Sequence, residues 1–229
     1  MRLAHGWMLE SSATGAESVI REYVRPAVRA IPRALARRFG GCRIRLRNHL
    51  ANPEHSSVWS WMGDGNAAFP TGFRELDRAL TPPGGGLEVE LACAGFDPHD
   101  IGMELLLCLG QALWERTRGA ERESWLGILR AETDAGISGE IDEEALREKQ
   151  RLLLSRASAR NRRRLERYAR ASFASTAAEY VHCLWHDVHV RGGPEHLPAV
   201  WLRGRLELFA RWFPPDRGYR LFAISEGHK

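Results

Sequence analysis

The sequence predicts an α+β protein that is rich in helix, with a small three-stranded sheet in its first half, a buried helix packed on that sheet, and a helical second half. Apolar and polar residues alternate in three short segments that end before residue 92, which is typical of strands. From Asp97 onward the apolar spacing is helical. With 229 residues, 44% of them hydrophobic, and no internal repeat, we expect one domain over residues 1–229, with flexible ends at 1–14 and 225–229.

The first helix is expected to begin at Thr14–Glu17, because "TGAE" has the spacing of a capping box, in which two side chains bind the free amides of the first turn. A second helical piece should begin near Pro32, with Leu35 and Phe39 facing inward. Gly40–Gly41 then ends it, since glycine tolerates the backbone conformation that follows a helix.

The three expected strands follow from a period of two. "CRIRLRN" alternates Cys42, Ile44 and Leu46 with arginines, the pattern of a half-buried strand. The segments 58–62 ("VWSWM") and 87–91 ("LEVEL") alternate in the same way. Glycine-rich and proline-rich stretches between them predict turns.

The second half should contain five helices. Asp97 is a suitable N-cap and Pro98 suits the first helical position, so a helix begins there, and its apolar sequence predicts burial on most sides. A short helix over 123–132 and a helix from about Asp142, with acids at its positive end, follow. Residues 161–188 predict one long helix, and 197–215 predict a last amphipathic one.

The net charge of +4 conceals strong segregation of charge along the chain. The segments Arg25–Arg47 and Arg147–Arg170 are basic, while Asp97–Glu144 is mainly acidic. Clustered arginine can neutralise phosphates, so nucleic acid is one candidate partner. The alternative is that basic and acidic segments of one domain neutralise each other. The use of arginine in place of lysine is itself typical of a GC-rich bacterial genome.

Nothing in the sequence predicts a membrane partner or secretion. The longest apolar run, Ile101–Leu109, is interrupted by Glu104 and is far shorter than the roughly 20 residues that span a bilayer. The N-terminus has no signal-peptide pattern. Four cysteines lie far apart without a CxxC pair, which favours reduced thiols and a cytoplasmic location.

The densest group of candidate ligands is "AAEYVHCLWHDVHV", at residues 177–190. In a helix, Glu179, His182 and His186 fall within an arc of about 60°, and two histidines four residues apart can hold one transition metal. The alternatives are no cofactor or a single zinc-like divalent metal. Cys183 points about 100° away from its neighbour His182, so the two residues cannot form a catalytic pair.

Several segments are similar to one metallopeptidase family. "IPRALARRFGGCRIRLRN", "HDIGMELLLCLGQALW", "TAAEYV" and "LELFARWFPP" occur in an order that resembles the zincin-like peptidases of the lethal-factor-like kind. That family has an active helix with His-Glu-x-x-His, in which the histidines bind zinc and the glutamate is the general base. A glutamate on a later helix supplies the third ligand.

The resemblance implies a degenerate zinc site in this chain. The active-helix motif is replaced by Met103-Glu104-Leu105-Leu106-Leu107, so Glu104 matches the general base while Met103 and Leu107 stand where the two histidines would be. Neither side chain can replace imidazole at zinc. Glu179 matches the third-ligand position.

Three functions therefore remain open. The first is a zincin-like fold without the family's zinc site, which acts as an interaction or regulatory module with a protein partner. The second is a metal-dependent hydrolase with a relocated site at Glu179, His182 and His186 and with Glu104 as a possible general base. The third is a basic nucleic-acid-binding protein that uses Arg25–Arg47 and Arg147–Arg170.

Overall fold

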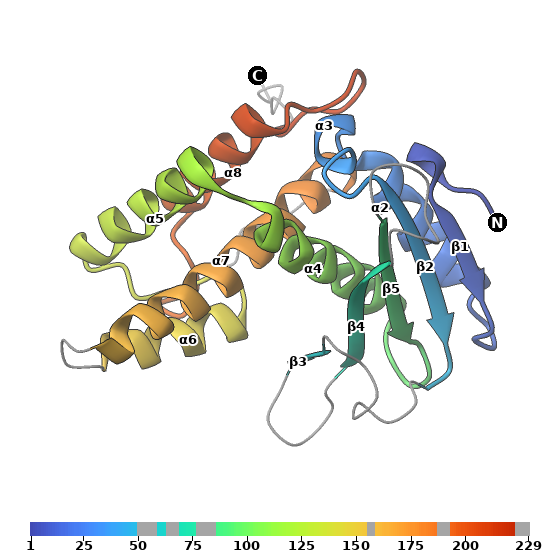
Figure 1. Ribbon diagram of the computed structural model, residues 1–229, viewed down its shortest axis with the longest axis horizontal. Helices are drawn as coiled ribbons and strands as arrows, with labels where there is room; N and C mark the ends of the chain where they lie inside the picture. The colour runs from blue at the N-terminus through green and yellow to red at the C-terminus, as the bar shows by residue number, and fades with distance from the viewer. Residues whose placement is uncertain (50–58, 63–68, 77–85, 155–158, 187–192, 223–229) are drawn as a thin grey trace, which may run out of the picture.

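The computed structural model describes residues 1–49, 59–62, 69–76, 86–154, 159–186 and 193–222. The protein is α+β, with a sheet formed by the first half of the chain and helices in the second half, as the sequence predicts. Figure 1 shows the sheet at one end of the molecule and the later helices at the other. In the described part, no helix has both the length and the apolar character needed to cross a bilayer.

The sheet contains the three expected strands and two more. Its strands are β1 (Met8–Ser11), β2 (Gly41–Arg47), β3 (Trp59–Met62), β4 (Phe69–Leu76) and β5 (Gly86–Ala92), in the spatial order β1-β2-β5-β4-β3. β1, β2 and β5 run parallel, whereas β3 and β4 are antiparallel to their neighbours. β1 is too short to show a period of two, and β4 contains Pro70 and Gly72, residues that argue against a strand in sequence.

The N-terminal segment 1–14, for which the sequence predicts flexibility, is anchored to the sheet. Trp7 and Leu9 are 1% and 2% exposed, and the amino group of Met1 donates to the Leu9 carbonyl at 2.5 Å. The free energy gained by burying these two apolar side chains outweighs the conformational entropy that the segment loses when it is ordered. The tail at 225–229 lies outside the described residues.

The first helical segment begins where the sequence predicts but without the expected capping box. Residues 17–30 form α1 (Glu17–Val19), the π-helical turn η2 (Ile20–Val24) and α2 (Arg25–Ala30), and the N-cap Ala16 makes no side-chain bond. Thr14 instead exchanges hydrogen bonds with Asn48, its amide donating to Oδ1 at 2.8 Å. That partner follows β2 and is 34 residues away in sequence, so local spacing could not reveal it.

The remaining helices match the expected pattern closely. They are α3 (Arg33–Ala36), α4 (Pro98–Arg116), α5 (Gly119–Asp134), α6 (Glu143–Leu153), α7 (Ala159–Trp185) and α8 (Ala199–Trp212). Asp97 caps α4 by accepting from the amide of His99 at 2.8 Å, and Asp142 caps α6 by accepting from the amide of Ala145 at 2.7 Å. Both predicted starts are therefore confirmed.

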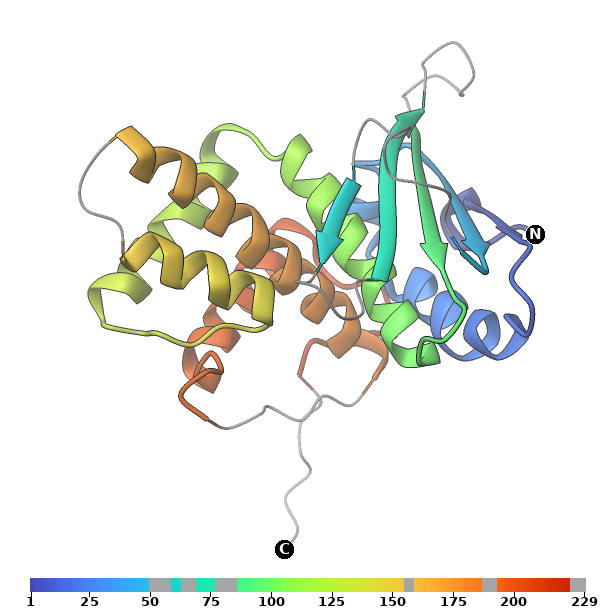
Figure 2. The same ribbon diagram turned by 90° about the horizontal axis from the view of Figure 1, so that it is seen from below.

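Helix α4 lies between the sheet and α7, which explains its burial on most sides (Figure 2). The two helices run antiparallel: Trp114, near the end of α4, packs on Phe173 in the middle of α7, with ring centroids 5.1 Å apart. They approach so closely at Gly110 that a Cβ there would lie 2.6 Å from the Ala174 carbonyl oxygen. As a result, the first turn of α4 meets the last turn of α7.

Candidate functional site

Three histidines gather where α4 begins and α7 ends. The ring centroid of His99, in the first turn of α4, lies 5.4 Å from that of His182 and 6.2 Å from that of His186. The two rings on α7 are 5.2 Å apart and nearly parallel, with an interplanar angle of 25°. We call His99, His182 and His186 the histidine cluster.

His182 is the buried member of the histidine cluster, at 8% exposure. Neither of its ring nitrogens has a hydrogen-bond partner among the described residues. Its nearest carboxylate oxygen is Glu179 Oε2, 3.6 Å from Nδ1, which is too long for a hydrogen bond. A buried polar group without a partner costs on the order of 1 to 3 kcal/mol, so this side chain requires an explanation.

Aromatic side chains border the histidine cluster. The ring of Tyr23 lies 5.8 Å from that of His99, and the ring of Trp185 lies 5.7 Å from that of His182. Tyr23 belongs to the π-helical turn η2, and such turns occur frequently at functional sites. Gly102 lets α4 approach this turn, because a Cβ there would lie 2.9 Å from the Tyr23 Cβ.

The structure brings together the stripe that the sequence predicts. Glu179 and His182, in the last turns of α7, are neighbours of His186, the residue that follows this helix. Spacing along the chain does not associate His99 with this stripe, because its position depends on the packing of α4 against α7. Burial, followed by the charge of Glu179, raises the pKa of the Cys183 thiol to about 12, which disfavours the reactive thiolate.

Glu104 lies on a different side of α4 from His99. It is 7% exposed and follows His99 by five residues, which corresponds to a rotation of about 140° around the helix axis. Met103 and Leu107 are partly buried and pack against the hydrophobic core. Helix geometry thus favours His99, and not Glu104, as the α4 residue that faces the α7 stripe. The role of Glu104 as a general base remains a prediction.

Within the described ranges, no group of three or more His, Cys, Asp or Glu side chains is arranged to hold a metal ion as it stands. In the histidine cluster, the rings of His182 and His186 are 5.2 Å apart and within 25° of parallel. Binding of one ion by all three rings would therefore require a rearrangement of these side chains.

Part of each basic segment forms ion pairs with acids in the described part of the chain. On β2, the Arg45 side chain forms ion pairs with the buried Glu88 at 3.1 Å and with Glu10 at 3.0 Å. Arg43 and Arg47, two residues before and after it, form further ion pairs: Arg43 with Glu10 and Glu88, and Arg47 with Glu90. In the second basic segment, Arg167 pairs with Glu148 and Arg170 with Glu115. This arrangement favours mutual neutralisation, and nucleic-acid binding remains a prediction.

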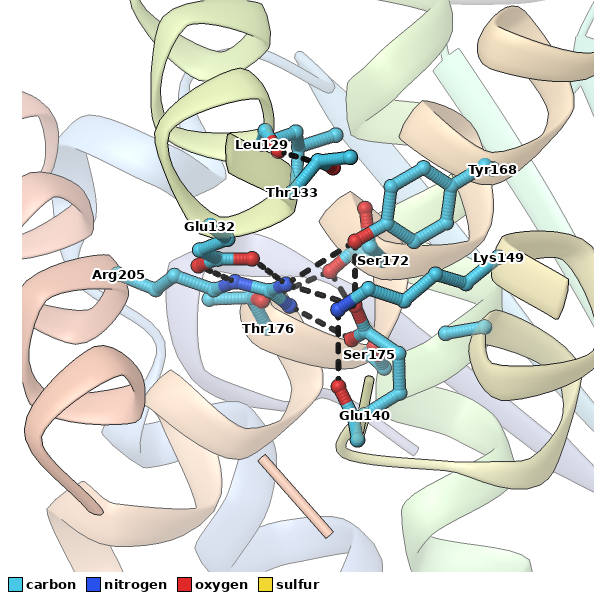
Figure 3. A network of polar contacts seen from close by, with 12 residues as sticks. Leu129, Glu132, Thr133, Glu140, Lys149, Tyr168, Ser172, Ser175, Thr176 and Arg205 are labelled. Carbon is cyan, nitrogen blue, oxygen red and sulfur yellow. Dashed lines mark hydrogen bonds and ion pairs between the residues drawn. The ribbon is translucent and has the colours of Figure 1, made fainter. Parts of the chain in front are cut away.

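Among the described residues, a separate cluster of buried charge lies between α5, α6, α7 and α8 (Figure 3). Arg205, from α8, is 0% exposed and donates to Glu132 at 2.8 Å and to Glu140 at 2.8 Å. Lys149 and the hydroxyl of Tyr168 also donate to Glu140, at 3.1 and 2.5 Å. We call these five residues the buried charge network. The spacing of these residues along the sequence does not predict it.

The buried charge network is structural, because its members satisfy one another. Two carboxylates face two cations, and Arg205 also lies over the ring of Trp125, 5.5 Å from its centroid. Burial by itself would raise the pKa of the Glu140 carboxyl, but the charge and hydrogen bonds of Arg205, together with Lys149 and Tyr168, hold this pKa at about 2.

We therefore expect acid to weaken the fold through Glu140. The folded pKa is about 2 and the ordinary value is 4.5, so the stabilisation is complete above pH 4.5 and is lost as the pH falls from 4.5 towards 2. The loss is on the order of 3 kcal/mol. Carboxyl-detected NMR should give a titration midpoint near 2 for Glu140. A midpoint at or above the ordinary value would contradict the buried ion pairs.

Comparison with protein-family models, with curated proteins and with solved structures finds no match to this chain. Function is therefore inferred from the geometry of the site.

Proposed function

We propose that the protein binds one zinc-like divalent metal ion with His99, His182 and His186. The observation that carries this proposal is His182, a buried imidazole with both ring nitrogens unpartnered in the described part of the chain. An ion accepts the lone pair of a neutral imidazole and so relieves the cost of burying it. An ordinary core histidine would have a hydrogen-bond partner for at least one nitrogen.

The spacing of the rings fits such an ion. With a metal–nitrogen distance of about 2.0 Å, the ring centroids of two histidines on one tetrahedral ion lie about 5 Å apart. The observed separations are 5.2, 5.4 and 6.2 Å, so rotation of the rings suffices without movement of the helices. His186 is exposed and the side chain of His99 is 40% exposed, so an ion can reach both rings from solvent.

The residues around the histidine cluster suggest roles for the bound ion. Glu179 Oε2 lies 3.6 Å from His182 Nδ1, and a closer approach on metal binding would let it accept from that nitrogen and orient the ring, as carboxylates do beside metal-binding histidines. Three imidazoles leave a fourth coordination position, which is typical of catalytic zinc sites and keeps the metal-dependent hydrolase as a candidate. Glu104, on another side of α4, is not needed for metal binding.

The alternative is the interaction or regulatory module that the zincin-like resemblance implies, with a protein partner and no metal. The replacement of the family's histidines by Met103 and Leu107 supports this alternative. The two functions differ in whether the purified protein carries metal.

A cytoplasmic location also belongs to the proposal, and the four free cysteines support it.

Elemental analysis of protein purified without chelator tests metal binding. We expect about one equivalent of zinc or a similar ion for the wild type, and less than a tenth of that for His182→Leu. His99→Ala and His186→Ala should each weaken metal binding by tenfold or more, because each variant removes one ligand and leaves the other two. His196→Ala, outside the histidine cluster, is the control and should bind as the wild type does.

The His182→Leu variant has a second readout that is independent of metal. Because leucine removes two unpartnered buried nitrogens, the metal-free variant should be as stable as the metal-free wild type, or up to about 1 kcal/mol more stable. Urea unfolding in chelator measures this difference. Absence of metal from wild-type protein, even after incubation with excess zinc, would favour the metal-free module and reject the metal site.

A further inference from the structure

A second polar site lies between the two ends of the described chain. The segment that follows α8 returns to lie beside α3, where Asp216 accepts from the amide of Arg33 at 3.2 Å (Figure 1). Between this segment, the ends of α2 and α3, and the N-terminal turn η1 (Ala4–Gly6) there is a hollow of about 490 Å³. Pockets that hold small molecules have volumes of about 300 to 1,000 Å³.

The hollow has an excess of positive charge. Arg29, Arg33 and Arg217 line it, and Asp216 is the one carboxylate among its lining residues. Asp216 forms an ion pair with the Arg33 side chain at 3.7 Å. The guanidinium groups of Arg29 and Arg217 are not neutralised by it. Neither Arg29 nor Arg217 has a hydrogen-bond or ion-pair partner in the part of the chain that the structure describes. Gathering like charges without a counterion is unfavourable, so an anion would stabilise this arrangement.

The walls of the hollow are held in place. Tyr219 belongs to the lining, and its amide donates a hydrogen bond to the Asp216 carbonyl at 3.1 Å, which closes the turn between them. On the opposite wall, His5 Nε2 donates to the Val28 carbonyl at 3.1 Å. The backbone of His5 has φ of 59°, a left-handed conformation that residues other than glycine adopt at an energetic cost. Such strain collects at binding sites more often than elsewhere.

We infer that this hollow binds the phosphoryl group of a small phosphorylated molecule. Guanidinium groups present paired donors that match phosphate oxygens, and two of them are available here. The volume exceeds the space that phosphate alone would fill, so the ligand carries an organic portion as well. The carboxylate of Asp216, which is held beside Arg33, repels phosphates. This repulsion disfavours a continuous polyanion such as a nucleic-acid strand more than it disfavours one phosphate monoester.

Calorimetric titration with phenyl phosphate, with inorganic pyrophosphate and with a single-stranded oligonucleotide tests this inference. We expect the wild type to bind phenyl phosphate, with affinity that falls between 50 and 200 mM salt, roughly as expected for a contact dominated by charge. The double variant Arg29→Gln/Arg217→Gln should bind at least about a hundredfold more weakly, at roughly tenfold for each lost charged contact.

The control is Arg130→Gln/Arg211→Gln, which removes the same net charge from exposed positions on α5 and α8. It should leave phenyl phosphate affinity within about twofold of the wild type, because neither arginine lines the hollow and exposed charges are screened by salt. All four arginines are exposed, so both variants should fold, which circular dichroism checks.

Three results would overturn the inference. One is absence of binding of both phosphate compounds to the wild type. Another is equal weakening in the two double variants, because that would reflect net charge and no local site. The third is tighter binding of the oligonucleotide than of phenyl phosphate, together with a loss of oligonucleotide affinity in Arg29→Gln/Arg217→Gln. That result would assign the hollow to nucleic acid.

Discussion

Replacing Arg205 with methionine should destabilise the protein by about 3 to 5 kcal/mol, the range found when one partner of a buried ion pair is removed. The guanidinium is 0% exposed and lies between Glu132 and Glu140, which are also buried. Without it, Glu132 keeps a buried charge with no cation, while Glu140 retains only Lys149. Thermal unfolding should occur on the order of 10 °C lower.

A variant on the same helix provides the matched control. Arg203 pairs with Glu207 at 3.4 Å, but its side chain is 61% exposed, so Arg203→Met should cost less than about 1 kcal/mol. The double variant Glu132→Leu/Arg205→Met removes one charge of each sign and should recover part of the loss. A loss below 1 kcal/mol for Arg205→Met, measured by urea unfolding, would mean that the buried charge network does not stabilise the native state.

Adding a single methyl group at Gly110 should cost about 1 to 3 kcal/mol. A Cβ at this position would lie 2.6 Å from the carbonyl oxygen and 2.8 Å from the Cα of Ala174. Both atoms belong to the backbone of α7 and cannot rotate away, so Gly110→Ala must push the two helices apart. Separation of α4 from α7 would also widen the histidine cluster and weaken metal binding.

Gly127 is the control, because it is an exposed helical glycine with nothing within 4 Å of the position of a Cβ. Gly127→Ala should stabilise the protein by up to about 1 kcal/mol, since alanine favours the helix. Chemical unfolding of both variants measures the two changes. Equal and small effects would show that the contact between α4 and α7 can be adjusted without cost.

Features that depend on interactions between residues close together in the sequence could be predicted, whereas features that depend on distant residues could not. Asp97 and Asp142 cap α4 and α6 as predicted, because a cap binds amides two or three residues along the chain. Cys42, Ile44 and Leu46 are buried on β2 as their alternation predicts. In contrast, β1 is formed through pairing with β2 and β4 through pairing with β5, and their own residues carry little strand signal.

The candidate site divides in the same way. Glu179, His182 and His186 share one helical face, and that follows from the helical period alone. The buried charge network, in contrast, joins residues that are up to 73 positions apart. Sequence shows their charges without showing that they meet or that water is excluded from them.

By itself, the sequence determined the α+β class, the helix starts and the stripe on α7, since each depends on neighbours within a few residues. Only the tertiary structure decided that His99 faces this stripe and that Arg29 and Arg217 line one hollow. The physical reason is that local spacing sets the direction of a side chain from its own helix. What that side chain meets depends on how the helices pack.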